Sequence, residues 1–516
     1  MKTRIQSILI VLTFLFLGLL PQMQAVSPAP DGCYPGFTTA EGCNALKFLG
    51  SGAGNTGVGW YSLYSVGGGN YNTGVGAGTL VLNTGDSNTA VGTAAMLLNT
   101  GGTQNVAVGT DALVYNDGGD DNNAVGYFAL FNNIDGTANS AFGTEALFKN
   151  IHGDSNTAIG NGALFNNDST GAGLGNENTA VGALALFSNT DGDSNTAIGL
   201  DALYSNDTGS GNTATGYRAL YSNTEGLNTA TGYQAMSNNT TGFSNTADGA
   251  FALMNNIAGE QNTAVGIGAL QHNNNDFNTA VGAGALGANT AGFRNTAVGF
   301  EALADLTSGS DNIAIGLDAG SNLTSGEVGN IDIDNSGVPG ENNTTRIGTL
   351  QSRTFIQGIH NAVVTGTSVV VSAAGQLGVA PSSQRFKTAM KRMDQASEAI
   401  LALKPVTFRY KKEIDPAAMP QFGLVAEEVE KVNPDLVTRD AEGKPYTVRY
   451  DAVNAMLLNE FLKEHRAFAE EQHKVAQQQK EIDALKAELK EQRSLIQNVS
   501  DRLEWKDSPQ VVVRDN

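Results

Sequence analysis

The sequence predicts a mostly β protein: a trimeric parallel β-solenoid (a β-roll), then a small α+β domain and a C-terminal trimeric coiled coil. Three observations favour this fold class. A short repeat rich in Asn and Gly fills the middle of the chain, large side chains are scarce, and an apolar heptad pattern marks the end. The 516 residues include 63 Gly and only 7% aromatic residues, so we expect several thin structures rather than one wide core.

The first 25 residues have the features of a secretory signal peptide. Two positive charges, Lys2 and Arg4, precede an apolar run from Ile8 to Leu20, and a small residue stands at Ala25. The run is shorter than the roughly 20 residues that span a bilayer, and no later segment is apolar enough, so we expect no transmembrane anchor. The sequence therefore predicts a secreted or cell-surface protein. An uncleaved N-terminal anchor is the alternative.

Residues 26–50 form an N-terminal segment that contains both cysteines of the chain, Cys33 and Cys43. In an exported protein two such cysteines commonly form a disulfide, and we expect one here that closes a small loop. A metal site built on the two cysteines is the alternative, but none of the five His residues is near them in the sequence.

Residues 51–325 are the repeat region. The block Asn-Thr-Ala-Val-Gly, or a close variant, recurs every 16 or 17 residues, with one gap of 22 where residues 169–173 look inserted. A second block, usually Ala-Leu, follows three residues after the Gly, and another Asn follows it, as at Asn99 and Asn116. This length is too short for two packed helices and suits one solenoid coil with two short strands and two turns. Stacked coils place each Asn above the next, which predicts ladders of side-chain amides.

Side-chain alternation predicts which residues face the inside of a coil. The third position of the first block is Ala or Gly and should point inward, and the fourth is usually Val or Ile and should point outward. An outward apolar stripe needs a partner, so we expect it, with the Leu of the second block, to pack against two other copies about a threefold axis. Three successive coils carry Thr215, Thr231 and Asp248 at the fourth position. They indicate either a packing irregularity or a hydrated, ion-binding stretch.

The repeat resembles the heads of trimeric autotransporter adhesins, in which short Asn-Ser/Thr-x-x-x-Gly units of three chains build a left-handed parallel β-roll. The resemblance covers roughly residues 51–325, although the unit here is somewhat longer. It implies a homotrimer with an adhesin-like role, for which a surface glycan or a protein is the expected ligand.

Residues 326–381 are expected to form a β-rich neck. Segments such as Thr345–Gly348, Thr354–Ile356 and Ser368–Val371 have the composition of short strands and are separated by Gly.

Residues 382–452 have the composition of a small α+β domain. Pro405–Tyr410 alternates like a strand, and Gly423–Val429 leads into a helix that should end before Pro434. A second, long helix begins near Tyr450.

Residues 453–505 are predicted to form a coiled-coil helix, followed by a tail at 506–516. Apolar residues recur at heptad spacing, while the companion positions are half polar and include Gln. Such repeats are typical of self-associating helices, and Gln in the core favours three strands over two. A single amphipathic helix that lies on its own domain is the alternative. The apolar heptad residues are Phe461, Phe468, Val475, Ile482, Leu489, Ile496 and Leu503.

The segment Pro381–Lys387, the Gly-Leu-Val-Ala-Glu-Glu-Val block and the region of Tyr450 together resemble the C-terminal intramolecular chaperone autoprotease of phage endosialidases and tailspikes, a tail fibre domain. The resemblance covers about residues 382–505. It implies a module that trimerises, guides the folding of the upstream β-fibre and cuts its own chain. The family's motif is Ser-Asp-x-Arg-x-Lys, and this chain has Ser-Ser-Gln-Arg-Phe-Lys, so Ser383 stands in place of Asp.

Position by position, the resemblance makes Ser382 the nucleophile and Lys387 its partner, with the cut between Pro381 and Ser382. This chemistry is physically reasonable, because a Lys of lowered pKa takes the proton of a Ser hydroxyl, and burial near cationic groups such as Arg385 lowers that pKa. The attacked carbonyl belongs to the same chain, so little translational entropy is lost. An inactive structural remnant of the dyad is the alternative. No cofactor is expected.

Charge is unevenly distributed along the chain. Residues 1–381 carry 8 Lys and Arg against 28 Asp and Glu, whereas residues 382–516 carry 22 against 23. The acidic first part repels phosphate backbones, so no nucleic-acid partner is expected. Two other functions remain as alternatives: a glycan-degrading tailspike-like enzyme, which needs paired carboxylates beside aromatic platforms, and an ice- or ion-binding solenoid.

Overall fold

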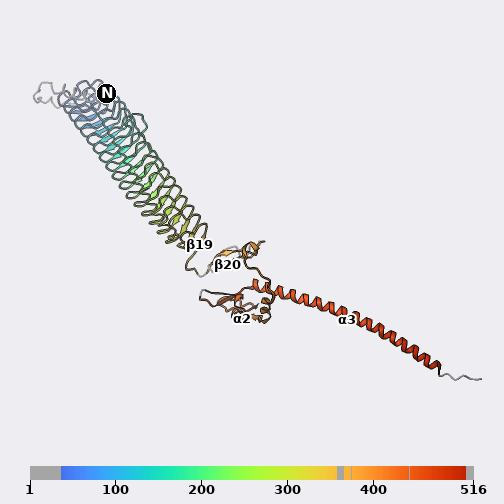
Figure 1. Ribbon diagram of the computed structural model, residues 1–516. Helices are drawn as coiled ribbons and strands as arrows, with labels where there is room; N and C mark the ends of the chain where they lie inside the picture. The colour runs from blue at the N-terminus through green and yellow to red at the C-terminus, as the bar shows by residue number, and fades with distance from the viewer. Residues whose placement is uncertain (1–35, 352, 357–364, 373–374, 441, 507–516) are drawn as a thin grey trace, which may run out of the picture. The chain divides into compact units, whose positions relative to one another are not determined.

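The computed structural model describes residues 36–351, 353–356, 365–372, 375–440 and 442–506. The chain divides into two compact units, residues 1–355 and residues 356–516 (Figure 1).

The N-terminal unit is a parallel β-solenoid (Figure 1). Its sheet has 19 strands that pair in sequence order, so each coil adds one short strand directly beside the strand of the coil before it. The strands are β1 Thr39–Glu41, β2 Thr56–Val58, β3 Thr73–Val75, β4 Thr89–Val91, β5 Val106–Val108, β6 Asn123–Val125, β7 Ser140–Phe142, β8 Thr157–Ile159, β9 Thr179–Val181, β10 Thr196–Ile198, β11 Thr213–Thr215, β12 Thr229–Thr231, β13 Thr246–Asp248, β14 Thr263–Val265, β15 Thr279–Val281, β16 Thr296–Val298, β17 Ile313–Ile315, β18 Ile331–Ile333 and β19 Thr345–Ile347.

The solenoid extends beyond both boundaries of the predicted repeat region, 51–325. Strand β1 pairs in parallel with β2, and β18 and β19 continue the same ladder to Ile347. Part of the predicted neck is therefore solenoid. Of the strands predicted there, Thr345–Gly348 corresponds to β19, and Ser368–Val371 contains β20 (Val370–Val371), which pairs antiparallel with β21 (Leu377–Gly378). Thr354–Ile356 is not a strand.

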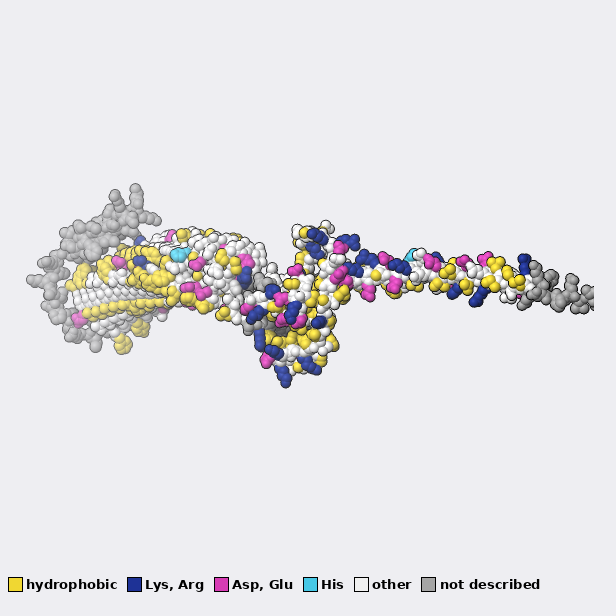
Figure 2. All heavy atoms as spheres, turned by 60° about the horizontal axis from the view of Figure 1, so that its bottom comes forward, with side chains coloured by type: hydrophobic (Ala, Val, Ile, Leu, Met, Phe, Trp, Pro, Cys, Tyr) yellow, Lys and Arg dark blue, Asp and Glu magenta, His cyan; other side chains and the backbone are white. Residues whose placement is uncertain are grey.

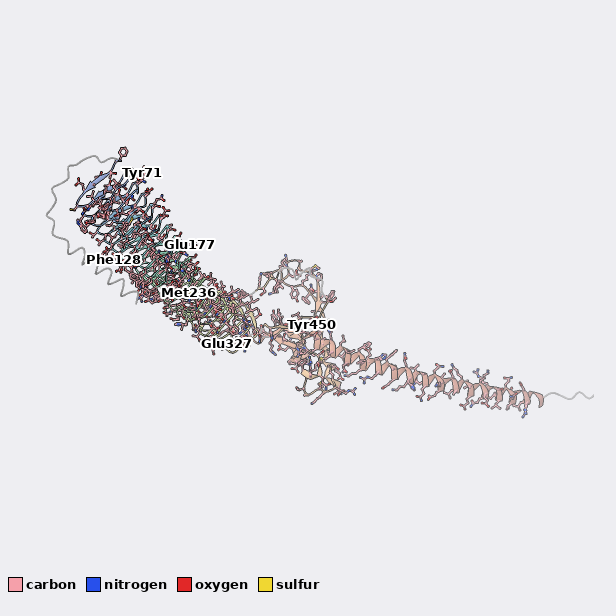
Figure 3. All side chains as sticks on the ribbon, turned by 90° about the horizontal axis from the view of Figure 1, so that it is seen from above. Tyr71, Phe128, Glu177, Met236, Glu327 and Tyr450 are labelled. Atoms are coloured by element: carbon pink, nitrogen blue, oxygen red, sulfur yellow. The ribbon has the colours of Figure 1, made fainter. Side chains whose placement is uncertain are left out.

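Each coil has one strand, and the prediction of two strands per coil is wrong. The second block forms turns, and its Leu has a left-handed backbone, with φ of 51° at Leu130 and 52° at Leu147. This conformation costs an L-residue about 1–2 kcal/mol. Burial of the Leu side chain contributes about 1.5–3 kcal/mol, which offsets that cost. Other left-handed residues, among them Phe128 and Met236, are spread along the solenoid (Figure 3).

The interior of the solenoid is narrow and is filled by Ala and Leu side chains. Ala124 and Ala141, at the third position of their blocks, are fully buried, so the prediction that this position faces inward is confirmed. Leu130 and Leu147 of the second blocks are fully buried as well. The Leu residues therefore do not belong to the outward stripe, contrary to the prediction that they help to form it.

The Gly that ends the first block sets how closely the coils approach each other. At Gly143 the backbone φ is 148°, and a Cβ there would lie 2.3 Å from the carbonyl oxygen of Gly160 in the next coil. Both the backbone conformation and the neighbouring coil therefore exclude a side chain at this position.

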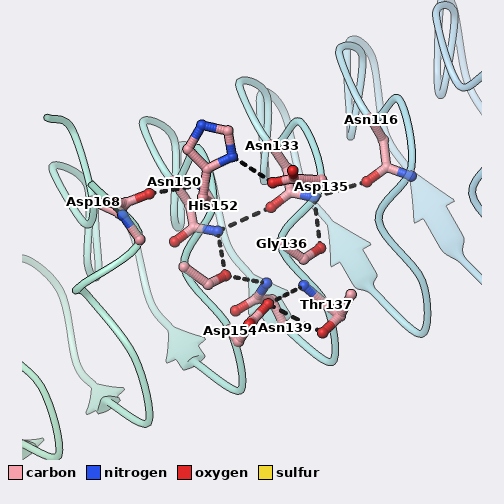
Figure 4. Close-up of polar contacts among 12 residues, drawn as sticks. Asn116, Asn133, Asp135, Gly136, Thr137, Asn139, Asn150, His152, Asp154 and Asp168 are labelled. Atoms are coloured by element: carbon pink, nitrogen blue, oxygen red, sulfur yellow. Dashed lines mark hydrogen bonds and ion pairs between the residues drawn. The ribbon is translucent and has the colours of Figure 1, made fainter. Parts of the chain in front are cut away.

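Two ladders of buried Asn side chains join the coils (Figure 4). In the first, the backbone N–H of Asn139 donates to Oδ1 of Asn122 at 3.0 Å. In the second, Nδ2 of Asn133 donates to Oδ1 of Asn116 at 2.7 Å and to the carbonyl oxygen of Gly136 at 2.9 Å. The predicted amide ladders are confirmed. The Asn side chains hydrogen-bond to backbone groups in the turns, which the short strand of each coil leaves unpaired.

The last two coils change the interior from apolar to polar. In register with the buried Ala314 of β17 stand Asp332 of β18 and Arg346 of β19. Burial raises the pKa of Asp332 to about 6, although the nearby Arg346 acts in the opposite direction. Arg346 also pairs with Glu341 at 2.7 Å. A polar end of this kind closes the apolar interior of a solenoid.

The C-terminal unit contains a small domain and one long helix. Its core is a cluster of buried apolar side chains from α2, β24, β25 and the first turns of α3. The predicted strand at 405–410, the predicted helix before Pro434 and the predicted helix near Tyr450 are confirmed. After β20 and β21, the elements are η1 Gln384–Phe386, η2 Asp394–Ala402, β22 Val406–Phe408, β23 Gln421–Gly423, α2 Ala426–Val432, η3 Pro434–Leu436, β24 Val437–Arg439, β25 Pro445–Val448 and α3 Tyr450–Lys506.

We expect Asn239→Ala to loosen the solenoid locally and its neighbour Asn238→Ala to leave it nearly unchanged. Asn239 is buried and donates to Asn223 at 2.7 Å and to Gly242 at 2.8 Å, whereas Asn238 is exposed and donates to Asn255 on the surface. Removing a buried partner costs about 1–3 kcal/mol, which corresponds to roughly 5- to 150-fold faster amide exchange. Hydrogen exchange resolved by coil measures this, and equal protection in both variants would contradict the role of the ladder.

We expect the stability of the C-terminal coils to fall as the pH rises from about 4 to about 6. The pKa of Asp332 is about 6 in the folded chain against an ordinary 3.8, so the folded state binds more protons in this window than the unfolded chain does. Hydrogen exchange of β18 and β19 at pH 4.5 and pH 7 tests this. Asp332→Asn should remove most of the difference. If the difference between the two pH values persists in this variant, a titrating group other than Asp332 causes it.

Candidate active site

Ser382 lies two residues before and Lys387 directly after a single 3-10 turn, η1 (Gln384–Phe386). The backbone N–H of Phe386 donates to the carbonyl oxygen of Ser383 at 3.1 Å, and that of Lys387 donates to the carbonyl oxygen of Gln384 at 3.0 Å. Ser383 before the turn and Lys387 after it are extended. The local sequence thus folds so that one short turn separates the two predicted catalytic residues.

Both side chains are exposed in the single chain. Within the described part of the chain, no hydrogen bond joins Ser382 to Lys387, and η1 contains no buried residue. The guanidinium of Arg385 lies over the ring of Phe386, 4.6 Å from its centroid. The single chain therefore does not by itself provide the burial of Lys387 that the predicted chemistry requires. A hollow in the same domain of about 160 Å³ is lined by Leu403, Val429 and neighbouring residues, and neither member of the dyad lines it.

A polar joint connects η2, the next element along the chain, to helix α3. The hydroxyl of Ser397 is buried, accepts from Nδ2 of Asn459 at 2.6 Å and hydrogen-bonds to Glu460. Lys463 pairs with Glu460 at 2.7 Å and with Glu398 at 3.3 Å. The hydrogen bonds from Lys463 and Ser397 lower the pKa of Glu460. The joint was missed in the sequence because its members lie more than 60 residues apart and match no local pattern.

Comparison with known proteins bears on this domain. The family model described as chaperone of endosialidase matches residues 382–438. The match begins at the predicted nucleophile and supports the predicted C-terminal chaperone domain. No curated protein matches the chain. No solved structure matches it. The similarity of the repeats to adhesin heads remains a prediction.

The first turns of α3 belong to the chaperone domain, but the rest of the helix does not pack on it. The hydroxyl of Tyr450 accepts a hydrogen bond from the backbone N–H of Leu424 at 3.0 Å, and Met456 is buried in the domain core. From residue 464 to residue 503, by contrast, every residue is exposed. The alternative of an amphipathic helix that lies on its own domain is therefore wrong.

The apolar heptad residues of α3 form an unpartnered stripe in the single chain. Their exposed fractions range from 45% at Ile482 to 68% at Ile496. A lone helix gains little from such a stripe in water, since most helical stability in proteins comes from packing an apolar face. The described part of α3 therefore carries an apolar stripe that its own chain does not cover.

The solenoid has a ladder of aromatic rings, which bears on the alternative of a glycan-degrading enzyme. Successive rings stack at centroid separations of 5.0–5.4 Å and interplanar angles of 4–18°. Because each ring covers the face of the next, mainly ring edges remain for solvent, and the ladder offers no flat platform for a sugar. The ladder consists of Phe131, Phe148, Phe165, Phe187, Tyr204 and Tyr221.

Other predicted features have mixed outcomes. Cys33 and the signal peptide at 1–25 lie outside the described residues, so the disulfide from Cys33 to the partly exposed Cys43 stays a prediction. Among the described residues, no three His, Cys, Asp or Glu side chains are grouped as metal ligands, and none of the described helices combines the length and apolarity needed to cross a membrane.

Proposed function

We propose that the protein is a secreted or cell-surface trimeric fibre. Its C-terminal chaperone domain trimerises, assists the folding of the solenoid and then cleaves the chain between Pro381 and Ser382. The observation that carries this proposal is the family match that begins at Ser382, downstream of a long β-solenoid.

The exposed stripe of α3 supports trimerisation. Seven apolar residues at heptad spacing give a continuous seam, and burying it removes half of the large exposed hydrophobic side chains of the helix from water. Gln residues at the companion positions hydrogen-bond to one another around a threefold axis. Trimerisation through α3 holds three chaperone domains close together and brings the three η1 turns within reach of neighbouring copies.

The cleavage step uses the residues that flank η1. The hydroxyl oxygen of Ser382 attacks the carbonyl carbon of Pro381, and the amine of Lys387 takes the hydroxyl proton. That proton passes to the leaving nitrogen of Ser382, and water then hydrolyses the ester between the two residues. The single chain leaves both side chains in solvent. Neighbouring copies therefore supply the desolvation that makes a Lys an effective base, which couples cleavage to completed assembly.

The solenoid that remains after cleavage is suited to an adhesin-like role. It is acidic and has no flat aromatic platform in its ring ladder, and its long, repetitive surface presents many equivalent positions to a surface glycan or a protein. Lys and Arg gather instead on the C-terminal unit (Figure 2). The alternatives of glycan cleavage and of ice or ion binding have no observation in their favour.

Cleavage is tested with the full chain. We expect the wild type to yield fragments that end at Pro381 and begin at Ser382, because the dyad is complete. Ser382→Ala and Lys387→Ala should both stay intact. Ser383→Ala and Lys391→Ala are matched controls that remove a neighbouring hydroxyl and a neighbouring exposed amine, and they should cleave as the wild type does. Denaturing electrophoresis and mass spectrometry measure the outcome, and an intact wild-type trimer would refute self-cleavage.

Trimerisation is tested in the Ser382→Ala chain, so that α3 stays attached. We expect this chain to be trimeric and its Ile482→Asp variant to dissociate at a protein concentration at which the parent chain stays trimeric, because the substitution places a charge in the apolar seam. Gln477→Asp adds the same charge on the opposite side of the helix and should preserve the trimer. Size-exclusion chromatography with light scattering distinguishes the species. A monomeric parent chain, or a trimer that tolerates Ile482→Asp, would contradict the role of α3.

A further inference from the structure

The outward face of the solenoid sheet is a surface that the proposed cleavage and the α3 stripe leave unexplained. We call this surface the strand face and define it as the first and third residues of strands β2 to β19, which are the second and fourth positions of the repeated block. Except in β11, β12 and β13, the third residue of the strand is Val, Ile or Phe. These side chains keep substantial exposure, for example 38% at Val75, 37% at Val108 and 44% at Ile159. Rows of hydrophobic side chains along the solenoid are visible in Figure 2.

The strand face is nearly free of charge, whereas the loops on another edge of the coils are acidic. Asp248 is the one charged residue among the first and third residues of β2 to β19. The loops before the first blocks carry, among others, Asp120, Asp154 and Asp193. Identical chains repel each other through an acidic edge and not through an uncharged face. Charge therefore selects the strand face for contact between copies.

The repeat of the strand face indicates what covers it. Every coil is in the same register, as Val75 beside Val91 shows, so the exposed side chains recur at the strand spacing of about 4.7–4.9 Å. A globular partner would cover only a few coils, because its surface does not repeat at this spacing. A second copy of the chain has the same repeat and matches the stripe along its whole length.

The available area is sufficient for a stable contact. Seventeen steps of about 4.8 Å give a stripe roughly 80 Å long. With a width of about 10 Å, it offers on the order of 800 Å² per copy, or roughly 400 Å² toward each of two neighbours, and the three contacts of a trimer together exceed the total area of a usual specific interface.

The three polar coils determine direction and register. Thr215, Thr231 and Asp248 interrupt the apolar stripe away from its middle, with nine strands from β2 to β10 before them and six strands from β14 to β19 after them. Antiparallel or shifted chains would bury Asp248 against Val or Ile, which is costly for an unpaired charge. Parallel chains in exact register place the polar coils beside each other, where water remains.

We propose that three solenoids pack through their strand faces, parallel and in register, with the Thr215–Asp248 segment as a hydrated gap between them. This inference rests on the proposed trimer and adds which surface of the solenoid the copies share. The α3 seam aligns the chains at one end, and the strand face continues that alignment along the fibre.

Single cysteines in the full-length Ser382→Ala chain, with Cys33 and Cys43 replaced by Ser, test the proposal. Val108→Cys and Val281→Cys lie on the strand face, and Asp154→Cys lies on the acidic loop edge as the control. After mild oxidation, we expect most chains with a strand-face cysteine to migrate as disulfide-linked species and the control to migrate as single chains. Light scattering of each variant establishes that it is trimeric.

A second measurement covers variants whose geometry prevents a disulfide. Under reducing conditions, the strand-face cysteines should be alkylated at least tenfold more slowly than the same cysteines in the unfolded chain. They should also be alkylated at least tenfold more slowly than the cysteine at position 154 of the control. A trimer that alkylates all three cysteines equally fast, or that cross-links through position 154, overturns this inference and leaves the proposed function intact. A monomeric Ser382→Ala chain overturns both.

Discussion

The solenoid depends on the hydrogen bonds that buried Asn amides make between successive coils. Each coil contributes one strand of three residues, and so short a strand secures only a small part of the coil's backbone. The remaining turns have donors and acceptors that water does not reach, and Asn side chains such as Asn122 and Asn133 satisfy them by donating to the carbonyl oxygen of Gly136. The amides also set the spacing of the coils, because each reaches the neighbouring coil only at the β-sheet distance.

This arrangement leaves a narrow interior. Inside each coil there is room for about one Ala from the strand and one Ala-Leu pair from the turns, as at Ala141, Ala146 and Leu147. Such a core buries little apolar area per residue, so part of the apolar content stays on the outward side of the strands. Helix α3 likewise leaves apolar side chains exposed, because its apolar seam has no partner in its own chain. Both units thus expose surfaces that neighbouring copies are suited to cover.

The exposed surface of the chaperone domain includes the turn at which cleavage is proposed. Its small core and the joint between Ser397 and Asn459 hold α3 firmly at its base, while the turn that bears Ser382 and Lys387 stays in solvent. The proposed cleavage requires that this dyad be shielded from water, which the single chain does not provide. Under that proposal only assembly buries the dyad, so the cut would follow formation of the fibre.

Local rules determined much of this protein from its sequence alone. Period-two alternation placed the Ala residues inside the coils, the repeat predicted the Asn ladders, and composition located the strand at 405–410, the helix before Pro434 and the long helix. The motif at 382–387 identified a domain that the family match supports. The exposure of Ser382 and Lys387 had no such signal, since it depends on what surrounds the turn.

Only the tertiary structure decided how each coil closes. The length of the repeat allowed a second strand at the Ala-Leu block, yet its Leu is left-handed, and this backbone turns the chain while the side chain points into the narrow interior. The ring ladder, the buried Asp332 and the joint at Ser397 likewise arise from residues brought together across coils or over more than 60 positions of sequence. Local propensity contains no information about such neighbours.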